Sequence, residues 1–342
     1  MNTRATPLIS IIMPTLNSEA TISLSLKSIR SQNLSDDLYE IIVVDGGSTD
    51  DTVKIAKAFD CRVLHNPKVL PEHAKLVGLA AAAGRYAMLL DSDEALCKKT
   101  SLQDKLHLLE TFRDVGNVVT AGSIVPKEYG GISDYANRFG DPFSYFIYRI
   151  DGSDYWNGLL NNYHTEVREK VLIATFVHSD ILPICDAGAH FFDLGYLKSI
   201  ADINDIRTVP IIFPVMASHT KKLAVISDDY TIHYSKQNWS SFKNKLRWRV
   251  ISNVHRATGA EGYRSRESFH PRWIYFKTIL FVLYGTSIVL PIYDAIRLAV
   301  SYRKLGFLVH FPATIYTLAA LAKQTIRRIF SKPGHLPTYG DR

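Results

Sequence analysis

Four short apolar runs, separated by stretches with helical character, fill the first ninety residues of this 342-residue chain. They cover residues 9–13, 39–44, 61–65 and 86–90. Apolar strands that alternate with helices are typical of a parallel sheet covered by helices on both faces. The pattern therefore predicts an α/β fold for this part of the chain.

Polar residues follow three of these runs at the point where each strand is expected to end. Residues 14–15 follow the first run, residues 45–47 the second and residues 91–94 the fourth. In a parallel sheet covered by helices, ligands bind beyond the carboxyl ends of the strands. The three polar segments are therefore predicted to meet at one edge of one sheet.

Residues 91–94 (Asp-Ser-Asp-Glu) place three carboxylates within four positions after an apolar strand. Such carboxylates are costly, because burial disfavours the charged form and like charges repel. A hard divalent cation relieves both costs, since it takes oxygen ligands and often binds the phosphates of a ligand as well. The alternative interpretation is a solvated acidic turn.

The three polar segments resemble, in order and spacing, the motifs of family 2 glycosyltransferases. The matching residues are 14–17 (Pro-Thr-Leu-Asn), 43–50 (Val-Val-Asp-Gly-Gly-Ser-Thr-Asp) and 90–93 (Leu-Asp-Ser-Asp). The resemblance implies an α/β fold of the GT-A (Rossmann-like) nucleotide-diphospho-sugar transferase type, with a mixed central sheet. It further implies a catalytic domain over residues 1–240, with a nucleotide-sugar half (1–100) and an acceptor half (101–240).

The resemblance also implies a pocket for a nucleotide-sugar donor. Asp45 would accept a hydrogen bond from the base, and Asp91 would contact the ribose or the outer shell of a metal. Lys75 stands where relatives commonly carry Arg, although it also suits a solvated helix face. Glu19 also suits an exposed acid in the first turn of a helix. The implied donor-binding residues are Pro14, Thr15, Glu19, Asp45, Lys75, Asp91 and Ser92.

A divalent metal, Mn²⁺ or Mg²⁺, is implied at the same edge. Asp93 would ligate it, with Asp91 as a further ligand, and the ion would neutralise charge on the departing diphosphate. His233 stands where many relatives have a histidine at a strand end, so it is the third candidate ligand. A histidine in an aromatic strand also suits a packed core, and both interpretations stay open.

An inverting transfer also needs a general base for the acceptor hydroxyl. Relatives supply it from an acidic pair at the start of a helix, and this chain shows no clear pair. Asp205 and Asp202 are the first candidates, followed by Asp193 and Asp186, although each also suits a helix cap or surface acid. The aromatic-rich residues 139–156 resemble an acceptor-side loop or lid, and aromatic side chains that pack against the sheet or the membrane are the favoured alternative.

Residues 241–342 have a different character: a basic and aromatic linker precedes two apolar segments, at about 273–293 and 305–322. These segments predict membrane-spanning helices, interfacial or re-entrant helices in the cytoplasmic leaflet, or a buried helical subdomain. The formal net charge of +7 is attributed to contact with membrane lipids. No nucleic-acid motif accompanies the charge, so nucleic-acid binding is not expected.

These observations predict an inverting, metal-dependent glycosyltransferase at the cytoplasmic face of a membrane. Three widely spaced cysteines indicate neither a disulfide framework nor a zinc site, and residues 1–9 lack a signal-type apolar core. The expected donor is a uridine diphosphate sugar, with guanosine diphosphate sugars as the alternative. The expected acceptor is a polyprenyl-linked saccharide or surface glycan. A polyprenyl-phosphate glycosyltransferase, a nucleotidyltransferase and a degenerate sugar-nucleotide-binding scaffold are the rivals, and oligomer formation is open.

Overall fold

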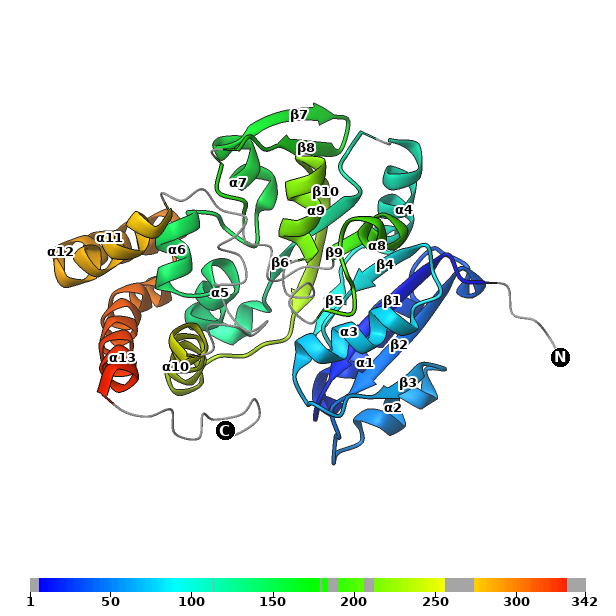
Figure 1. The fold of residues 1–342 in the computed structure, drawn as a ribbon, viewed down its shortest axis with the longest axis horizontal. Helices are drawn as coiled ribbons and strands as arrows, with labels where there is room; N and C mark the ends of the chain where they lie inside the picture. Colours follow the sequence, from blue (N-terminus) through cyan, green and yellow to red (C-terminus); the bar gives the residue numbers. More distant parts are fainter. Residues whose placement is uncertain are drawn as a thin grey trace.

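The computed structural model describes residues 6–112, 114–178, 180–183, 190–205, 212–255 and 274–330 (Figure 1). Its strands are β1 (Ile9–Thr15), β2 (Tyr39–Asp45), β3 (Arg62–His65), β4 (Tyr86–Leu89), β5 (Glu94–Leu96), β6 (Val118–Ile124), β7 (His164–Arg168), β8 (Val171–Thr175), β9 (His190–Asp193) and β10 (Lys222–His233). They form one sheet in the order β3-β2-β1-β4-β9-β6-β10-β8-β7, with β5 paired to β10.

The four strands expected from the sequence form the parallel part of this sheet. β1 pairs with β2 and β4, and β2 pairs with β3, all in parallel. Every residue of β1 is buried, because helices cover both faces of the sheet. The helices of this half are α1 (Glu19–Arg30), η1 (Asp36–Leu38), α2 (Thr52–Ala58), α3 (Pro71–Ala81) and α4 (Ser101–Thr111).

The two faces of β1 carry different helices. Ile9 and Met13 share a core with side chains of α1, α2 and α4. Ile12 points to the other face, where α3 crosses so closely that a Cβ on Gly78 would lie 2.3 Å from Ile12 Cγ2. This packing holds the carboxyl ends of β1 and β2 in a fixed position.

The second half of the sheet is mixed. β9 runs antiparallel to both β4 and β6, whereas β10 runs parallel to β6 and antiparallel to β5 and β8. β10 is twelve residues long, and its register against β6 shifts between Val225 and Tyr230. The strand therefore continues to His233, which pairs with Glu94 of β5 at the edge where β1, β2 and β4 end.

Most of residues 139–156 are helical, and Tyr145 and Tyr155 are buried, which agrees with the packed alternative and not with a loop or lid. The remaining helices within the described residues are η2 (Lys127–Tyr129), α5 (Gly130–Phe139), α6 (Pro142–Tyr148), α7 (Tyr155–Asn162), α8 (Leu194–Ile200), α9 (Ile212–Thr220), α10 (Trp239–His255), α11 (Ile274–Thr286), α12 (Val289–Ser301), η5 (Leu305–Val309) and α13 (His310–Phe330). In Figure 1, α5 and α6 lie between the sheet and the C-terminal helices.

The helices α10, α12 and η5 share a core with α5. Tyr135 and Phe139 of α5 pack in one cluster with Phe242 of α10, Leu298 of α12 and Phe307 of η5. The rings of Tyr135 and Phe242 meet edge to face at 6.0 Å between centroids, a favourable aromatic arrangement. The C-terminal helices are therefore packed against the rest of the chain through α5.

The apolar segment expected as one helix over about residues 273–293 is broken. α11 ends at Thr286, α12 begins at Val289, and the two are bent by 85°. Pro291 explains the break, because its ring would clash with the carbonyl of Ser287 in a continuous helix. Ile288 at the corner has a φ of 59°.

The second apolar segment lies in a helical stretch, Leu305–Phe330, that is long and apolar enough to cross a membrane. Together α11 and α12 pass the same test only if the bent pair is counted as one span. These are properties of length and composition, and a core helix shares them.

Large apolar side chains are exposed along α11 and α12, which project beside α6 at the left of Figure 1. On α11 they recur three or four residues apart, so they form one stripe along the helix. The exposed side chains are Phe276, Ile279, Leu280, Val282, Leu283, Val289, Leu290, Ile292, Tyr293, Ile296 and Val300. These residues are called the apolar face below.

Candidate active site

The ends of β1 and β2 lie side by side and are joined by side-chain contacts. Thr15 is aligned with Asp45 in the parallel register, and the Thr15 hydroxyl donates to Asp45 Oδ1 at 3.3 Å. Asp45 Oδ2 accepts from the backbone N–H groups of Gly47 and Ser48, both at 2.9 Å. Gly47 has a φ of 93°, which a residue with a side chain rarely adopts.

Asp45 is buried, and its carboxylate closes this turn. The Ser48 hydroxyl also donates to Oδ1, so each of the two oxygens accepts two hydrogen bonds. A carboxylate offers about four acceptor positions. A base that donates to Asp45 must therefore replace the hydroxyl of Thr15 or Ser48, both of which can rotate away.

The other predicted donor-side residues support the same loops. Glu19 begins α1, and its carboxylate accepts from the backbone N–H of Asp51 at 3.1 Å. Ser92 is buried and donates to the hydroxyl of Ser18 at 2.9 Å. Pro14 is buried within β1. Glu19 and Ser92 thus connect the three strand ends, while Pro14 is part of the sheet.

Lys75 of α3 faces the strand ends, which differs from the alternative of a solvated helix face. Its Nζ lies 3.0 Å from Asp91 Oδ1, and its side chain is 23% exposed. Burial alone would lower the pKa of Lys75, but the negative charge of Asp91 outweighs it and the pKa is raised. Lys75 therefore carries a fixed positive charge beside the acidic segment.

Asp93 and His233 are brought together from segments 140 positions apart in the chain. His233 Nε2 lies 3.2 Å from Asp93 Oδ2. Burial would raise the pKa of Asp93, but the bond from His233 outweighs it and lowers the pKa. Burial would likewise lower the pKa of His233, and Asp93 raises it instead. Each group thus stabilises the charged form of the other.

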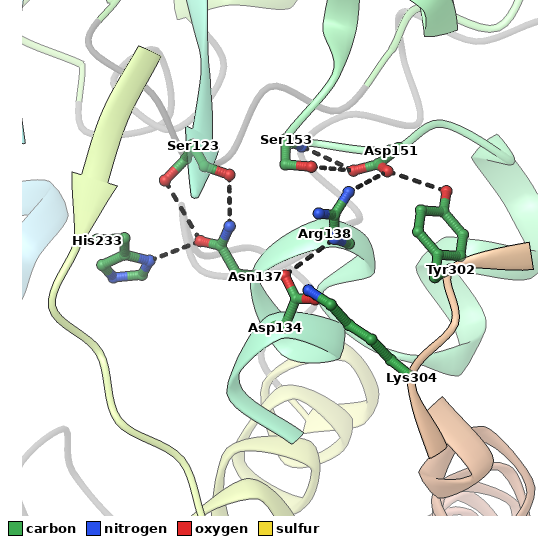
Figure 2. A network of polar contacts seen from close by, with 9 residues as sticks. All are labelled: Ser123, Asp134, Asn137, Arg138, Asp151, Ser153, His233, Tyr302 and Lys304. Atoms are coloured by element: carbon green, nitrogen blue, oxygen red, sulfur yellow. Dashed lines mark hydrogen bonds and ion pairs between the residues drawn. The ribbon is translucent and has the colours of Figure 1, made fainter. Parts of the chain in front are cut away.

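Two residues at this site were given no role by the sequence. Glu94 is buried in β5, where burial, reinforced by the charge of Asp91, raises its pKa to about 7. Asn137 of α5 accepts from the other ring nitrogen of His233 at 2.9 Å (Figure 2). The acidic run pointed to Glu94, but no sequence pattern identified Asn137.

A metal ion fits this site only in combination with a ligand. Within the part of the chain that the structure describes, no group of three or more His, Cys, Asp or Glu side chains could hold an ion alone. Mg²⁺ is usually bound by one or two protein carboxylates together with substrate phosphates. The pair Asp93 and His233 suits that arrangement, because the diphosphate of a donor would supply the missing oxygen ligands.

The candidate general bases lie in different places. Asp193 ends β9 opposite Tyr86, the first residue of β4, whereas the acidic segment follows the last residue of β4. Asp193 also caps α8 by accepting from the Tyr196 N–H at 2.9 Å. Asp193 therefore lies at the end of β4 away from residues 91–94, a position that does not support its prediction as a base.

The other candidates lie after α8 or in an undescribed segment. Asp202 is exposed, and its carboxylate accepts from the backbone N–H of Asn204 at 2.9 Å. Asp205 is half-buried in the same turn. Asp186 lies outside the described residues. Asp202 and Asp205 stay predictions.

Parts of the chain are similar to known glycosyltransferases. Residues 10–172 match the family model described as "Glycosyl transferase family 2". A PGL/p-HBAD biosynthesis glycosyltransferase of Mycobacterium tuberculosis is 35% identical over 104 residues, which cover 29% of this chain and 40% of that protein. Glucosyl-3-phosphoglycerate synthase of the same species is 42% identical over 94 residues, 25% of this chain and 28% of that protein. The chain thus spans less than half the length of these curated relatives.

A solved mannosyltransferase structure resembles nearly the whole chain. The mannosyltransferase PcManGT from Pyrobaculum calidifontis, solved with GDP-Man and Mn²⁺, has a TM-score of 0.54 at 15% identity. The likeness covers 94% of this chain and 88% of that one. At this level of identity the comparison concerns the fold alone, and it confirms the GT-A fold with its mixed sheet.

Proposed function

Residues 10–172 belong to glycosyl transferase family 2, and from this premise we propose that the chain is an inverting, metal-dependent glycosyltransferase. It transfers a sugar from a nucleoside diphosphate to a lipid-linked saccharide or surface glycan. The observation that carries the proposal is the meeting of Asp93, His233 and the Lys75–Asp91 pair at the edge where β1 and β2 end. This edge combines nucleotide-binding turns with ligands for a divalent cation.

The donor would lie across the ends of β1, β2 and β4. Asp45 and Thr15 would bind the base, with a hydroxyl of the turn making way for it. The favoured donor is a uridine diphosphate sugar. A guanosine diphosphate sugar is the alternative, because the structural neighbour PcManGT was solved with GDP-Man.

The diphosphate would lie beside Asp93 and His233, which would hold Mn²⁺ or Mg²⁺ together with its oxygens. When bound, such an ion stabilises negative charge on the departing diphosphate as a Lewis acid. Lys75 adds a second positive charge, kept in place by Asp91. Glu94 is buried and has a pKa of about 7, so it is partly protonated near pH 7. This limits the negative charge that residues 91–94 carry.

We place the general base at Asp205, with Asp202 as the second candidate. Asp205 is half-buried, whereas Asp202 is exposed. The base would take the proton of the acceptor hydroxyl as that hydroxyl attacks the anomeric carbon from the face opposite the diphosphate. The anomeric configuration would therefore be inverted.

The acceptor is proposed to be lipid-linked because of the apolar face on α11 and α12. Side chains of this kind are stabilised when they lie in the boundary between lipid head groups and acyl chains. The broken helix pair suits an interfacial position at the cytoplasmic leaflet, with Leu305–Phe330 packed beside it. Transfer to polyprenyl phosphate itself would use the same surface.

The test is sugar transfer by the full chain from labelled UDP- and GDP-sugars to polyprenyl-linked and soluble saccharides. We expect one donor to be used with lipid-linked acceptors and the product to have inverted stereochemistry by NMR. Asp205→Asn should lower kcat by at least ~100-fold while donor binding is kept, whereas Asp202→Asn should have a smaller effect. Donor binding without turnover on any acceptor would instead identify a sugar-nucleotide-binding scaffold.

A further inference from the structure

Asn137 connects the end of β6 with the end of β10. It lies on α5, and its Nδ2 donates to the backbone carbonyl of Ser123 at 2.6 Å. Its Oδ1 lies 2.9 Å from His233 Nδ1 and accepts from the Ser123 hydroxyl at 3.3 Å. Figure 2 shows the Asn137 amide between the two strands, with its oxygen toward the imidazole.

The contact with Ser123 fixes which way the amide points. A backbone carbonyl can only accept, so the amide atom that lies 2.6 Å from it must be the donating nitrogen. The amide oxygen therefore faces His233, and because an amide oxygen can only accept, Nδ1 of the ring must carry a proton. The opposite ring nitrogen, Nε2, is directed at Asp93.

The helix that carries Asn137 is fixed on its other side. Arg138, the next residue, contacts Asp134 at 2.9 Å and Asp151 at 2.6 Å. Tyr302 donates to Asp151 at 2.9 Å, and Lys304 pairs with Asp134. Figure 2 shows that Tyr302 and Lys304 come from the C-terminal segment, so contacts on both sides hold α5 in place.

We infer that Asn137 is a positioning residue for His233. It holds the imidazole with a proton on Nδ1 and directs Nε2 toward Asp93, where a divalent cation would bind. The inference rests on the proposed metal-dependent function. Partners of this kind fix the ring orientation of a metal-binding histidine, and their loss commonly weakens metal binding 10- to 100-fold.

Two variants of the full chain separate the hydrogen bond from the space that the side chain fills. Asn137→Leu keeps a similar size but cannot accept from Nδ1. Asn137→Asp keeps an acceptor for Nδ1 and loses only the hydrogen bond that Nδ2 donates to the Ser123 carbonyl. We expect the Kd for Mn²⁺, measured by electron paramagnetic resonance with UDP present, to rise ~10- to ~100-fold in Asn137→Leu and to rise much less in Asn137→Asp.

A second measurement needs no metal. In protein labelled with ¹⁵N at histidine, the Nδ1–H of His233 should give a proton signal protected from exchange with water, assigned by its loss in His233→Gln. Asn137→Leu should abolish the protection. Lys304→Met, which removes a contact on the far side of α5, is the control for general loosening of that helix and should leave the signal in place.

The inference is overturned if Asn137→Leu keeps both the protected signal and the Mn²⁺ affinity. It is also overturned if Asn137→Leu and Asn137→Asp weaken Mn²⁺ binding equally, because that result indicates a role in packing. A wild-type protein that binds no Mn²⁺ but shows the protected signal would refute the proposed metal while confirming the bond from His233 to Asn137.

Discussion

The apolar face of α11 and α12 should carry the attachment of the protein to membranes. Ile279 and Leu283 lie one turn apart on α11 and are 63% and 61% exposed. Full burial of such a side chain contributes about 1.5–3 kcal/mol, so the exposed part of each is worth about 1–2 kcal/mol. Replacing both by Ser should therefore cost about 2–4 kcal/mol of binding to lipid, a ~30- to ~900-fold weaker partition.

The assay is flotation of the protein with lipid vesicles over a range of lipid concentrations. The matched control replaces Val167 and Val177 by Ser, since these residues are 51% and 59% exposed but lie on the sheet side of the molecule. The control should bind vesicles as the wild type does. If the α11 variant also binds as the wild type does, the apolar face does not contact lipid. A wild-type dimer that this variant splits into monomers, measured by sedimentation, would then identify a second copy of the chain as its partner.

Three further predictions concern stability, each measured as the free energy of unfolding in urea. Glu94 has a pKa of about 7 in the folded protein against an ordinary value of 4.5, so it binds more protons folded than unfolded and stability falls as pH rises between these values. Relative to Glu94→Gln, the wild type should lose about 2–3 kcal/mol from pH 4.5 to 8, and parallel curves for the two proteins would refute this. Gly78→Ala should cost about 1–3 kcal/mol because the new Cβ meets Ile12 at 2.3 Å, and an unchanged stability would mean that α3 can shift away from β1. Lys105 of α4 and Asp229 of β10 form a buried ion pair. Lys105→Met should cost about 3–5 kcal/mol because it leaves Asp229 charged and buried, whereas the loss should be smaller when Asp229→Asn is added, and equal losses would contradict the reasoning.

The nucleotide half could be predicted from the sequence because its signals are local. Each strand is a short apolar run, and each site segment follows directly along the chain, as residues 45–47 and 91–94 do. In parallel strands the carboxyl ends share one edge, so local signals were sufficient to bring these segments together.

The acceptor half could not be predicted in the same detail because its contacts are distant in sequence. Tyr135 and Phe139 lie in the core only because Phe242, Leu298 and Phe307 cover them, more than a hundred positions later. Without those partners the aromatic segment resembles a loop. The position of Asp193 depends likewise on β9 running antiparallel to β4, which no local pattern reveals.

The break between α11 and α12 could not be predicted from the apolar composition of residues 273–293. The apolar run has nearly the length of a membrane span, but Pro291 prevents a continuous helix and turns the chain by 85°. A proline within an apolar run was therefore a better guide to local structure than the hydrophobicity of the run.

Donor binding is the most direct test of the proposed metal-dependent transferase. Binding of a panel of nucleotide sugars to the detergent-purified protein should be measured by calorimetry with and without Mn²⁺, for the wild type and Asp93→Ala. We expect one nucleotide sugar to bind only with Mn²⁺ and Asp93→Ala to weaken that binding at least ~10-fold. Equal binding of every donor, unchanged by Mn²⁺ and by Asp93→Ala, would contradict the proposed site.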